Sequence, residues 1–319
     1  MNLRLVGLLV AALSTTNFAL ASDRDNRTIT LVVNMSAGGP LDVVSRIVAE
    51  KLGPLLGRPL VVINKVGASG NIGANDVAKS APDALTVLFT TDAPVVINPM
   101  IFSNMPFKTE DLKPVALMGS VQSAISVPTA SGIQSLDDLV KAGKAKSLNF
   151  SSSGHGSPAH LGSAMLAQSA GVQANHVPYR GGGPAAMALA SGEVNAGVLS
   201  LPGILAFVKD GRIKPLAITS TRRSSQFPDV PTTTELGYPE VQTDLLFLIM
   251  VPAKTPDAVT ERLQSAIMTA LADASVKERL SGLGIDTSGP SNAAAATSAL
   301  DMLRTRFAKT VKQAGIKVE

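Results

Sequence analysis

Apolar and polar residues along the chain follow two alternating patterns. Short runs of branched apolar residues predict buried strands, and the segments between them repeat an apolar residue every three or four positions, which predicts helices. Strands that alternate with helices are typical of an α/β domain with a mainly parallel sheet. The predicted strands are 29–33, 60–63, 86–89, 115–118, 124–127, 148–151, 174–177, 196–199, 216–219 and 246–251.

The alternation ends after the last of these strands. Residues 256–272, 276–282 and 292–314 predict helices with no strand between them. We expect such a tail to wrap back over a domain formed earlier in the chain.

The first 21 residues carry the features of an export signal. Arg4 precedes an apolar run from Leu5 to Leu13, and Ala19-Leu20-Ala21 is a small-x-small cleavage pattern. The apolar run is too short to span a bilayer, which disfavours its retention as a membrane anchor. We therefore expect a signal peptide over residues 1–21, cleavage near Ala21 and an exported mature chain.

The rest of the chain is long enough for two domains, at about 150 residues for each. No Pro-, Gly- or Ser-rich linker separates them, so we expect extended crossover strands near 117–127 and 244–251 to join them. The sequence thus predicts one lobe from residues 22–122 and 247–319 and a second lobe from residues 123–246.

Composition excludes several classes of function. The chain has no cysteine, so neither disulfides nor thiolate metal sites are available. Only 16% of its residues are charged, 28 Lys and Arg against 24 Asp and Glu, and its basic clusters have no interleaved aromatic residues. A nucleic-acid partner is therefore not expected, whereas the mildly positive net charge favours an anionic small molecule.

Candidate chemistry lies in loops that precede predicted helices. Gly38-Gly39-Pro40 and Gly182-Gly183-Pro184 each follow a strand and open a helix, and small polar residues repeat the arrangement at 67–73, 151–158 and 200–203. The first N–H groups of a helix have no intrahelical acceptor and attract an anion. Together the loops predict a polar cleft at one edge of the sheets; taken singly, each is equally well explained as a turn.

Other chemistries fit the sequence poorly. The first loop lacks the G-x-G-x-x-G spacing of dinucleotide sites, and no G-x-S-x-G nucleophile elbow is present, so no cofactor is expected. The three histidines, His155, His160 and His176, match no zinc-binding spacing, so no metal is expected. His155 and Ser157 could serve as base and nucleophile of an exported hydrolase, but no orienting acid lies nearby in sequence, and a ligand-contacting or capping role is favoured.

Three further side chains have two interpretations each. Asp42 lies in the first turn of its helix, where it either caps that helix or accepts a hydrogen bond from a ligand. Arg180 either neutralises a bound anion or points to solvent, and Tyr179 either flanks the anion or points to solvent.

In their order, these loops resemble those of the exported receptors of the tripartite tricarboxylate transporter family, often called Bug-type binding proteins. The resemblance covers essentially the whole mature chain. Its motifs are Gly38-Gly39-Pro40 with Asp42, Asn64 with Gly67 to Ala74, Ala81-Pro82-Asp83, Asn98-Pro99, Ser153 to Ser157 with His160-Leu161, Val177 to Gly181, Pro231-Thr232 with Glu235 to Pro239, and Val251 to Ala253 with Thr255-Pro256.

The resemblance implies a two-lobed periplasmic binding protein fold of the type II kind, in which each lobe is a mainly parallel sheet flanked by helices. Such a receptor is a monomer without enzymatic activity. It closes over a small carboxylate-bearing solute in the cleft between its lobes and delivers it to the permease subunits in the membrane. A receptor that signals to a membrane sensor is the alternative within the same fold.

The chain departs from the family pattern where aromatic or charged residues are usual, at Asn34 to Ala37, Ala84-Leu85, Asn195 and Leu245 to Phe247, which leaves the identity of the ligand open. The resemblance also implies that main-chain amides and small hydroxyl groups hold the carboxylate. The loops and the resemblance together predict these ligand-binding residues: Ser36, Ala37, Gly38, Gly39, Asp42, Ser69, Gly70, Asn71, Thr90, Thr91, Asp92, Ser153, His155, Gly156, Ser157, Tyr179, Arg180, Gly181, Gly182, Asn195 and Ser200.

Overall fold

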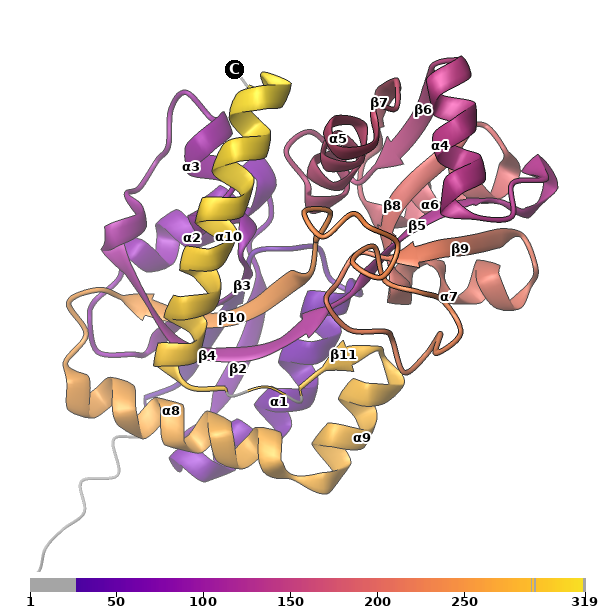
Figure 1. Cartoon of the computed structure of the whole chain (residues 1–319). Helices are drawn as coiled ribbons and strands as arrows, with labels where there is room; N and C mark the ends of the chain where they lie inside the picture. The colour runs from indigo at the N-terminus through magenta and orange to yellow at the C-terminus, as the bar shows by residue number, and fades with distance from the viewer. Residues whose placement is uncertain (1–26, 288, 290, 318–319) are drawn as a thin grey trace, which may run out of the picture.

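The computed structural model describes residues 27–287, 289 and 291–317. Two sheets form its framework, and helices cover them (Figure 1). The expected export signal falls on residues 1–21, which lie outside the described range. Within that range no helix is both long and apolar enough to cross a membrane.

The first sheet has six strands in the order β11-β4-β10-β3-β1-β2. Leu31, Val32 and Val33 of strand β1, which lies between β3 and β2, are wholly buried, as expected of a strand with helices on both faces. Its strands are β1 (Ile29–Val33), β2 (Leu60–Asn64), β3 (Thr86–Thr91), β4 (Leu112–Val121), β10 (Leu245–Pro252) and β11 (Ile285–Asp286). Its helices are α1 (Pro40–Leu56), α2 (Asn71–Ala78), α3 (Asn98–Ile101), α8 (Asp257–Ala272), α9 (Ala274–Gly282) and α10 (Ala293–Ala314).

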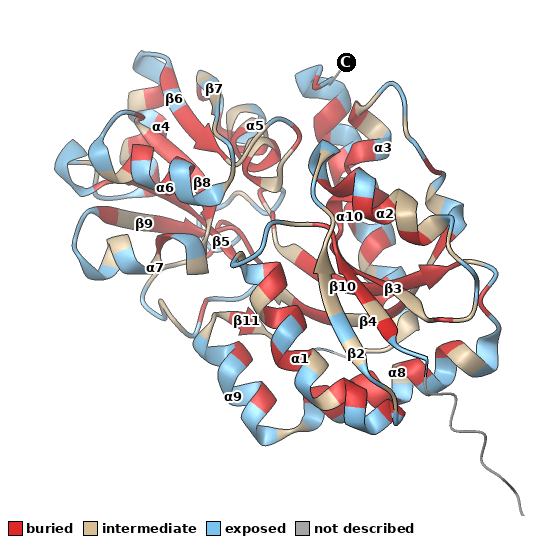
Figure 2. Ribbon diagram, turned by 180° about the vertical axis from the view of Figure 1, so that it is seen from behind, coloured by how far each residue is buried: buried red, intermediate tan, exposed pale blue. Residues whose placement is uncertain are grey.

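The second sheet has five strands in the order β7-β6-β8-β5-β9. Buried residues line both sheets, and the outer faces of the helices are exposed (Figure 2). The strands of the second sheet are β5 (Ser123–Pro128), β6 (Leu148–Ser152), β7 (Ala174–Pro178), β8 (Ala196–Ser200) and β9 (Ile213–Ile218). Its helices are α4 (Leu136–Ala145), α5 (Pro158–Ala170), α6 (Gly182–Ser191) and α7 (Leu201–Lys209).

Every strand predicted from the sequence is present, but the sheets are mixed rather than mainly parallel. Strands β1, β2 and β3 are parallel, as are β6, β7 and β8. Strand β10 runs antiparallel to β3 and β4, and β5 runs antiparallel to β8 and β9. Strands β5 and β10 are antiparallel to their neighbours because the chain crosses into each of them from the other sheet. Each therefore begins beside the carboxyl ends of the parallel strands and runs in the opposite direction.

The C-terminal tail contains a strand that the sequence analysis missed. The two-residue strand β11 lies between α9 and α10 and pairs with β4. Two residues are too few to show a period-2 pattern, so the prediction of a strand-free tail was wrong here. The tail packs back over the first sheet, and α10 reaches the other half of the molecule, where the amide of Gln168 in α5 donates to the carbonyl of Thr310 at 3.4 Å (Figure 1).

Two buried carboxyl groups stand at the return crossing into β10. The backbone N–H of Leu246 donates to Oδ1 of Asp92 at 3.0 Å. The other oxygen, Oδ2, is buried without a hydrogen-bond partner among the described residues. Burial, together with the nearby charge of Asp244, outweighs the hydrogen bond from Leu246 and raises the pKa of Asp92 to about 7. Burial also raises the pKa of Asp244 to about 6.

The raised pKa of Asp92 predicts a pH-dependent stability. The unfolded chain releases this proton near pH 4, whereas the folded chain keeps it to about pH 7. The free energy of unfolding should therefore fall as pH rises through this window, by up to about 1.4 kcal/mol per pH unit from this group. In urea unfolding at pH 5, 6 and 7, the free energy of unfolding should fall less steeply with pH for Asp92→Asn than for the wild type. The exposed Asp210→Asn is the control, and equal slopes for Asp92→Asn and wild type would contradict the assignment.

Candidate ligand-binding cleft

A cavity of about 570 Å³ lies between the two sheets. Thr91 ends β3 and Ser200 ends β8, whereas Ser123 and Leu245 begin the crossing strands β5 and β10, and all four residues line the cavity. The carboxyl ends of the parallel strands and the amino ends of the crossing strands thus face one space. Ligands of open α/β sheets bind at this kind of edge.

Five helix beginnings reach this cavity. Gly39 precedes α1, Ser69 lies in the turn before α2, Ser157 precedes α5, Gly181 precedes α6 and Ser200 precedes α7. Among the described residues, a side chain caps only α5 of these five helices. The first N–H groups of a helix have no intrahelical acceptor, and each helix start carries roughly half a positive charge. The cavity is therefore a place where an anion is stabilised without a cationic side chain.

The turn at Ser69 is held in an uncommon backbone conformation. Ala68 and Ser69 have φ values of 47° and 53°, in the left-handed region that costs a non-glycine residue about 1–3 kcal/mol. Buried amides behind the turn hold it. Nδ2 of Asn98 donates to the carbonyl of Ser69 at 3.0 Å, and Nδ2 of Asn34 donates to the carbonyl of Gly70 at 3.1 Å. Both carbonyls are therefore engaged by these amides.

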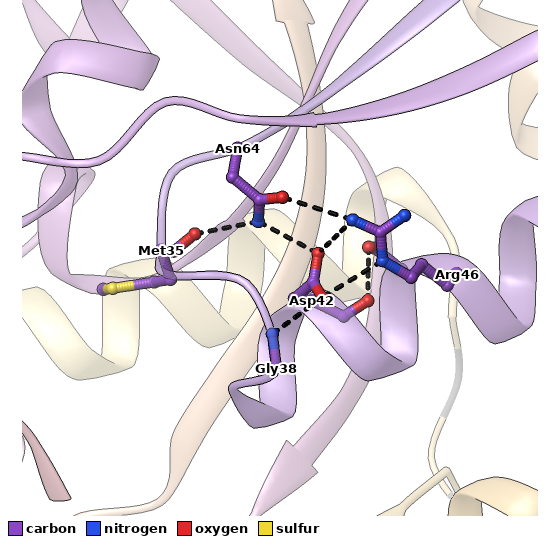
Figure 3. A network of polar contacts seen from close by, with 6 residues as sticks. Met35, Gly38, Asp42, Arg46 and Asn64 are labelled. Carbon is purple, nitrogen blue, oxygen red and sulfur yellow. Dashed lines mark hydrogen bonds and ion pairs between the residues drawn. The ribbon is translucent and has the colours of Figure 1, made fainter.

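Asp42 holds the first loop in place (Figure 3). Its Oδ2 accepts the backbone N–H of Gly38 at 2.9 Å, and both its oxygens accept from Arg46. Nδ2 of Asn64 donates to Oδ1 of Asp42 at 2.9 Å and to the carbonyl of Met35 at 3.0 Å. Burial by itself raises the pKa of Asp42, but the hydrogen bonds from Arg46, Gly38 and Asn64 outweigh it and lower the pKa to about 2. The carboxylate is therefore charged, and both its oxygens accept hydrogen bonds from the chain.

The fold gathers the three histidines, although their spacing gave no sign of it. The rings of His160 and His176 stack with centroids 3.5 Å apart, and His155 packs edge-on against both. Burial lowers the pKa of His160 to about 4 and that of His176 to about 3. Of these three, only His155 lines the cavity, and it is exposed.

The histidines are also the one group of potential metal ligands in the described part of the chain, with ligand atoms within 4.8 Å of one another. Two features oppose a metal ion. The stacked rings are parallel to within 6°, so their in-plane lone pairs do not converge. Nδ1 of His160 accepts the N–H of Gly156 at 3.2 Å, and Nε2 of His176 is 2.5 Å from the hydroxyl of Ser152. The cluster fastens the 153–157 turn to β7.

Ser157 acts as a helix cap. Its hydroxyl accepts the backbone N–H of His160 at 3.2 Å and donates to the carbonyl of Gly154 at 2.8 Å. A nucleophile would instead need to donate to a base, as in a serine–histidine pair. The arrangement matches the capping interpretation.

The structure brings about half of the predicted binding residues to the cavity wall. Thr91 stands out among them, because its Oγ1 is buried without a hydrogen-bond partner in the described chain. The predicted residues on the wall are Ser36, Gly39, Ser69, Thr91, Ser153, His155, Gly156, Ser157, Gly181, Gly182 and Ser200. Their binding of a ligand stays a prediction.

The other predicted residues lie off the wall: Ala37, Gly38, Asp42, Gly70, Asn71, Thr90, Asp92, Tyr179, Arg180 and Asn195. Several of them make internal contacts. The hydroxyl of Tyr179 donates to Glu193 at 2.7 Å. Burial of the hydroxyl and this hydrogen bond raise the pKa of Tyr179 to about 12. Asn195 accepts the N–H of Asn149 at 2.8 Å just before β8, at the opposite end of that strand from Ser200. Arg180 is exposed.

Sequence reasoning missed most of the apolar wall. Motifs of glycine and small polar residues drew attention to loops, whereas much of the wall comes from strands and from the segment around α3. The predicted crossovers were the available signal, because Ser123, Leu245 and Phe247 lie on them. The missed wall residues are Met35, Leu41, Ala93, Asn98, Phe102, Ser123, Ala159, Val198, Leu199, Leu245 and Phe247. Five further wall residues belong to the predicted loops but not to the predicted binding residues: Pro40, Gly154, Pro158, Gly183 and Gly203.

Comparison with solved structures supports the two-lobed architecture. Rpa4515 of R. palustris with adipate superposes with a TM-score of 0.83 at 29% identity, covering 92% of this chain and 99% of that chain. MatC from Rhodopseudomonas palustris with bound malate has a TM-score of 0.78 at 26% identity, covering 89% and 99%. The periplasmic binding protein BugD has a TM-score of 0.79 at 28% identity, covering 92% and 99%.

Sequence comparison gives the family. The protein BugT of Bordetella pertussis is 34% identical over 286 residues, which is 88% of each chain. The UPF0065 protein in the tcbD–tcbE intergenic region of Pseudomonas sp. strain P51 is 35% identical over 268 residues, 83% of this chain and 80% of that protein. The model of the tripartite tricarboxylate transporter family receptor matches residues 44–315. The chain therefore belongs to this family of periplasmic solute-binding receptors.

Proposed function

We propose that this receptor captures a small carboxylate-bearing solute between its two lobes and delivers it to the permease subunits of a tripartite tricarboxylate transporter. The meeting of five helix beginnings at one cavity supports this most strongly. The adipate and malate held by two similar proteins add support, because both ligands are carboxylates.

The proposed lobes are residues 22–122 with 247–319 and residues 123–246. Only two segments join the sheets, one at Gln122 between β4 and β5 and the other between β9 and β10. Such paired crossings allow hinge closure around a ligand. In this scheme the receptor acts as a monomer that binds and closes without making or breaking bonds, and no cofactor is required. The capping role of the Ser157 hydroxyl supports this scheme over the alternative of a hydrolase that uses Ser157 and His155.

A carboxylate that fits should stabilise the folded receptor. At a hundredfold excess over its dissociation constant, a ligand that binds only the folded state adds about 2.7 kcal/mol to the free energy of unfolding. Differential scanning fluorimetry against mono-, di- and tricarboxylates and acidic amino acids should therefore show a clear rise in Tm for a subset. Amides of the same acids are the control. A flat response to the whole panel would count against the proposal.

Removal of a single backbone N–H at the start of α6 tests whether helix beginnings bind the carboxylate. Gly182 is the first residue of α6, it lines the cavity, and a Cβ added there meets no atom within 4 Å. Proline is tolerated at this helical position and removes only the N–H. We expect Gly182→Pro to fold normally and to weaken carboxylate binding by about tenfold or more, the loss expected for a charge-assisted hydrogen bond.

The matched control is Ala274→Pro, at the exposed first position of α9, away from the cavity. Isothermal titration calorimetry with any carboxylate that stabilises the wild type should give an unchanged dissociation constant for this variant. Wild-type affinity in Gly182→Pro would show that this N–H does not bind the carboxylate.

A further inference from the structure

The cavity has an unusual balance of charge for a receptor of anions. Among the described residues, its wall carries no Lys, Arg, Asp or Glu, and its one titratable side chain is the exposed His155. Carbon atoms make up most of the wall area. The large apolar residues of the wall are Met35, Leu41, Phe102, Val198, Leu199, Leu245 and Phe247.

This wall limits how many charges a buried ligand can carry. Each helix beginning supplies a partial positive charge of roughly one half, so a carboxylate needs at least two of them to balance its charge. A second or third carboxylate placed against the apolar wall would lose its water without gaining a cation, and an unpaired buried charge costs several kcal/mol. A multiply charged, hydroxylated acid therefore fits this chain poorly.

The same wall favours an apolar ligand body. Phe247 is wholly buried and its ring packs 6.3 Å from that of Phe89, so this part of the wall is rigid. Phe102 and Leu245 are only partly buried and leave apolar surface to be covered. A cavity of about 570 Å³ has room for a body well beyond the carboxylate itself.

We propose that the solute is an acid with one buried carboxylate and an apolar body, an aliphatic chain or an aromatic ring, in preference to hydroxylated di- and tricarboxylates. This inference rests on the proposed function and names the class of solute that the receptor takes. The carboxylate lies at the helix beginnings, and the body lies against Phe102, Leu245 and Phe247. A second carboxylate is accommodated only at the exposed edge, beside His155.

Calorimetry with an unbranched series from butyrate to octanoate tests the proposal. Each methylene buried against the wall should tighten the dissociation constant by about fourfold until the cavity is filled. Hexanoate should bind at least tenfold more tightly than citrate, and butyrate should bind more tightly than malate. The two acids of each pair have the same number of carbon atoms. Benzoate and cyclohexanecarboxylate extend the comparison to rings.

A polar substitution in the wall separates this effect from general binding. Phe102→Gln should reduce the affinity for octanoate more than that for butyrate and so flatten the gain per methylene. Met302→Gln is the control, because Met302 is 60% exposed on α10 and does not line the cavity. Leu245→Gln provides a second wall variant if Phe102→Gln fails to fold.

The outcomes separate the class of solute from the function itself. The proposed class of solute would be wrong if citrate or malate bound more tightly than its carbon-matched monocarboxylate, or if the dissociation constant did not change with chain length. Either result would leave the proposed receptor function unaffected. Binding of none of these acids, nor of any other carboxylate, would overturn the proposed function.

Discussion

The first N–H groups of the helices that begin at the cavity are the constraint on which the rest of this structure depends. A helix leaves its first donors without internal acceptors, and no side chain caps four of the five helices that begin at the cavity. Because these helices begin at one cavity, an anion there is, in the proposed function, the acceptor of their free donors. In the proposed function the backbone balances the charge of the solute, which is consistent with a cavity wall that carries no lysine or arginine among the described residues.

Much of the surrounding structure keeps these donors in position. The Asp42 network ties the first loop to α1 and β2, the amides of Asn34 and Asn98 hold the Ser69 turn, and the stacked histidines fasten the loop after β6. Rigid donors need no reorganisation when the ligand arrives, which favours binding. The buried Asp92 accepts a hydrogen bond from Leu246 at the crossing into β10. A titratable group therefore lies at one of the two segments that join the proposed lobes.

The sequence predicted the strands well because each is a short apolar run bounded by turns, and it predicted the helix beginnings because glycine, proline and small polar residues mark them. It did not predict strand direction, since apolar runs such as 246–251 look the same in either orientation. It did not place Asp42, Tyr179 or Asn195, because their contacts with Arg46, Glu193 and Asn149 depend on tertiary structure. The cluster of His155, His160 and His176 was hidden for the same reason: β7 brings His176 beside α5.

The central claim is that backbone donors at helix beginnings hold the acid, and NMR of the receptor labelled with ¹⁵N-glycine observes those donors directly. On saturation with a bound carboxylate, the amide protons of Gly182 and Gly183 should move downfield, because each gains a charged acceptor. Gly171 and Gly315, which end α5 and α10 rather than begin a helix, should keep their shifts. A saturated receptor in which Gly182 and Gly183 do not move would contradict the account.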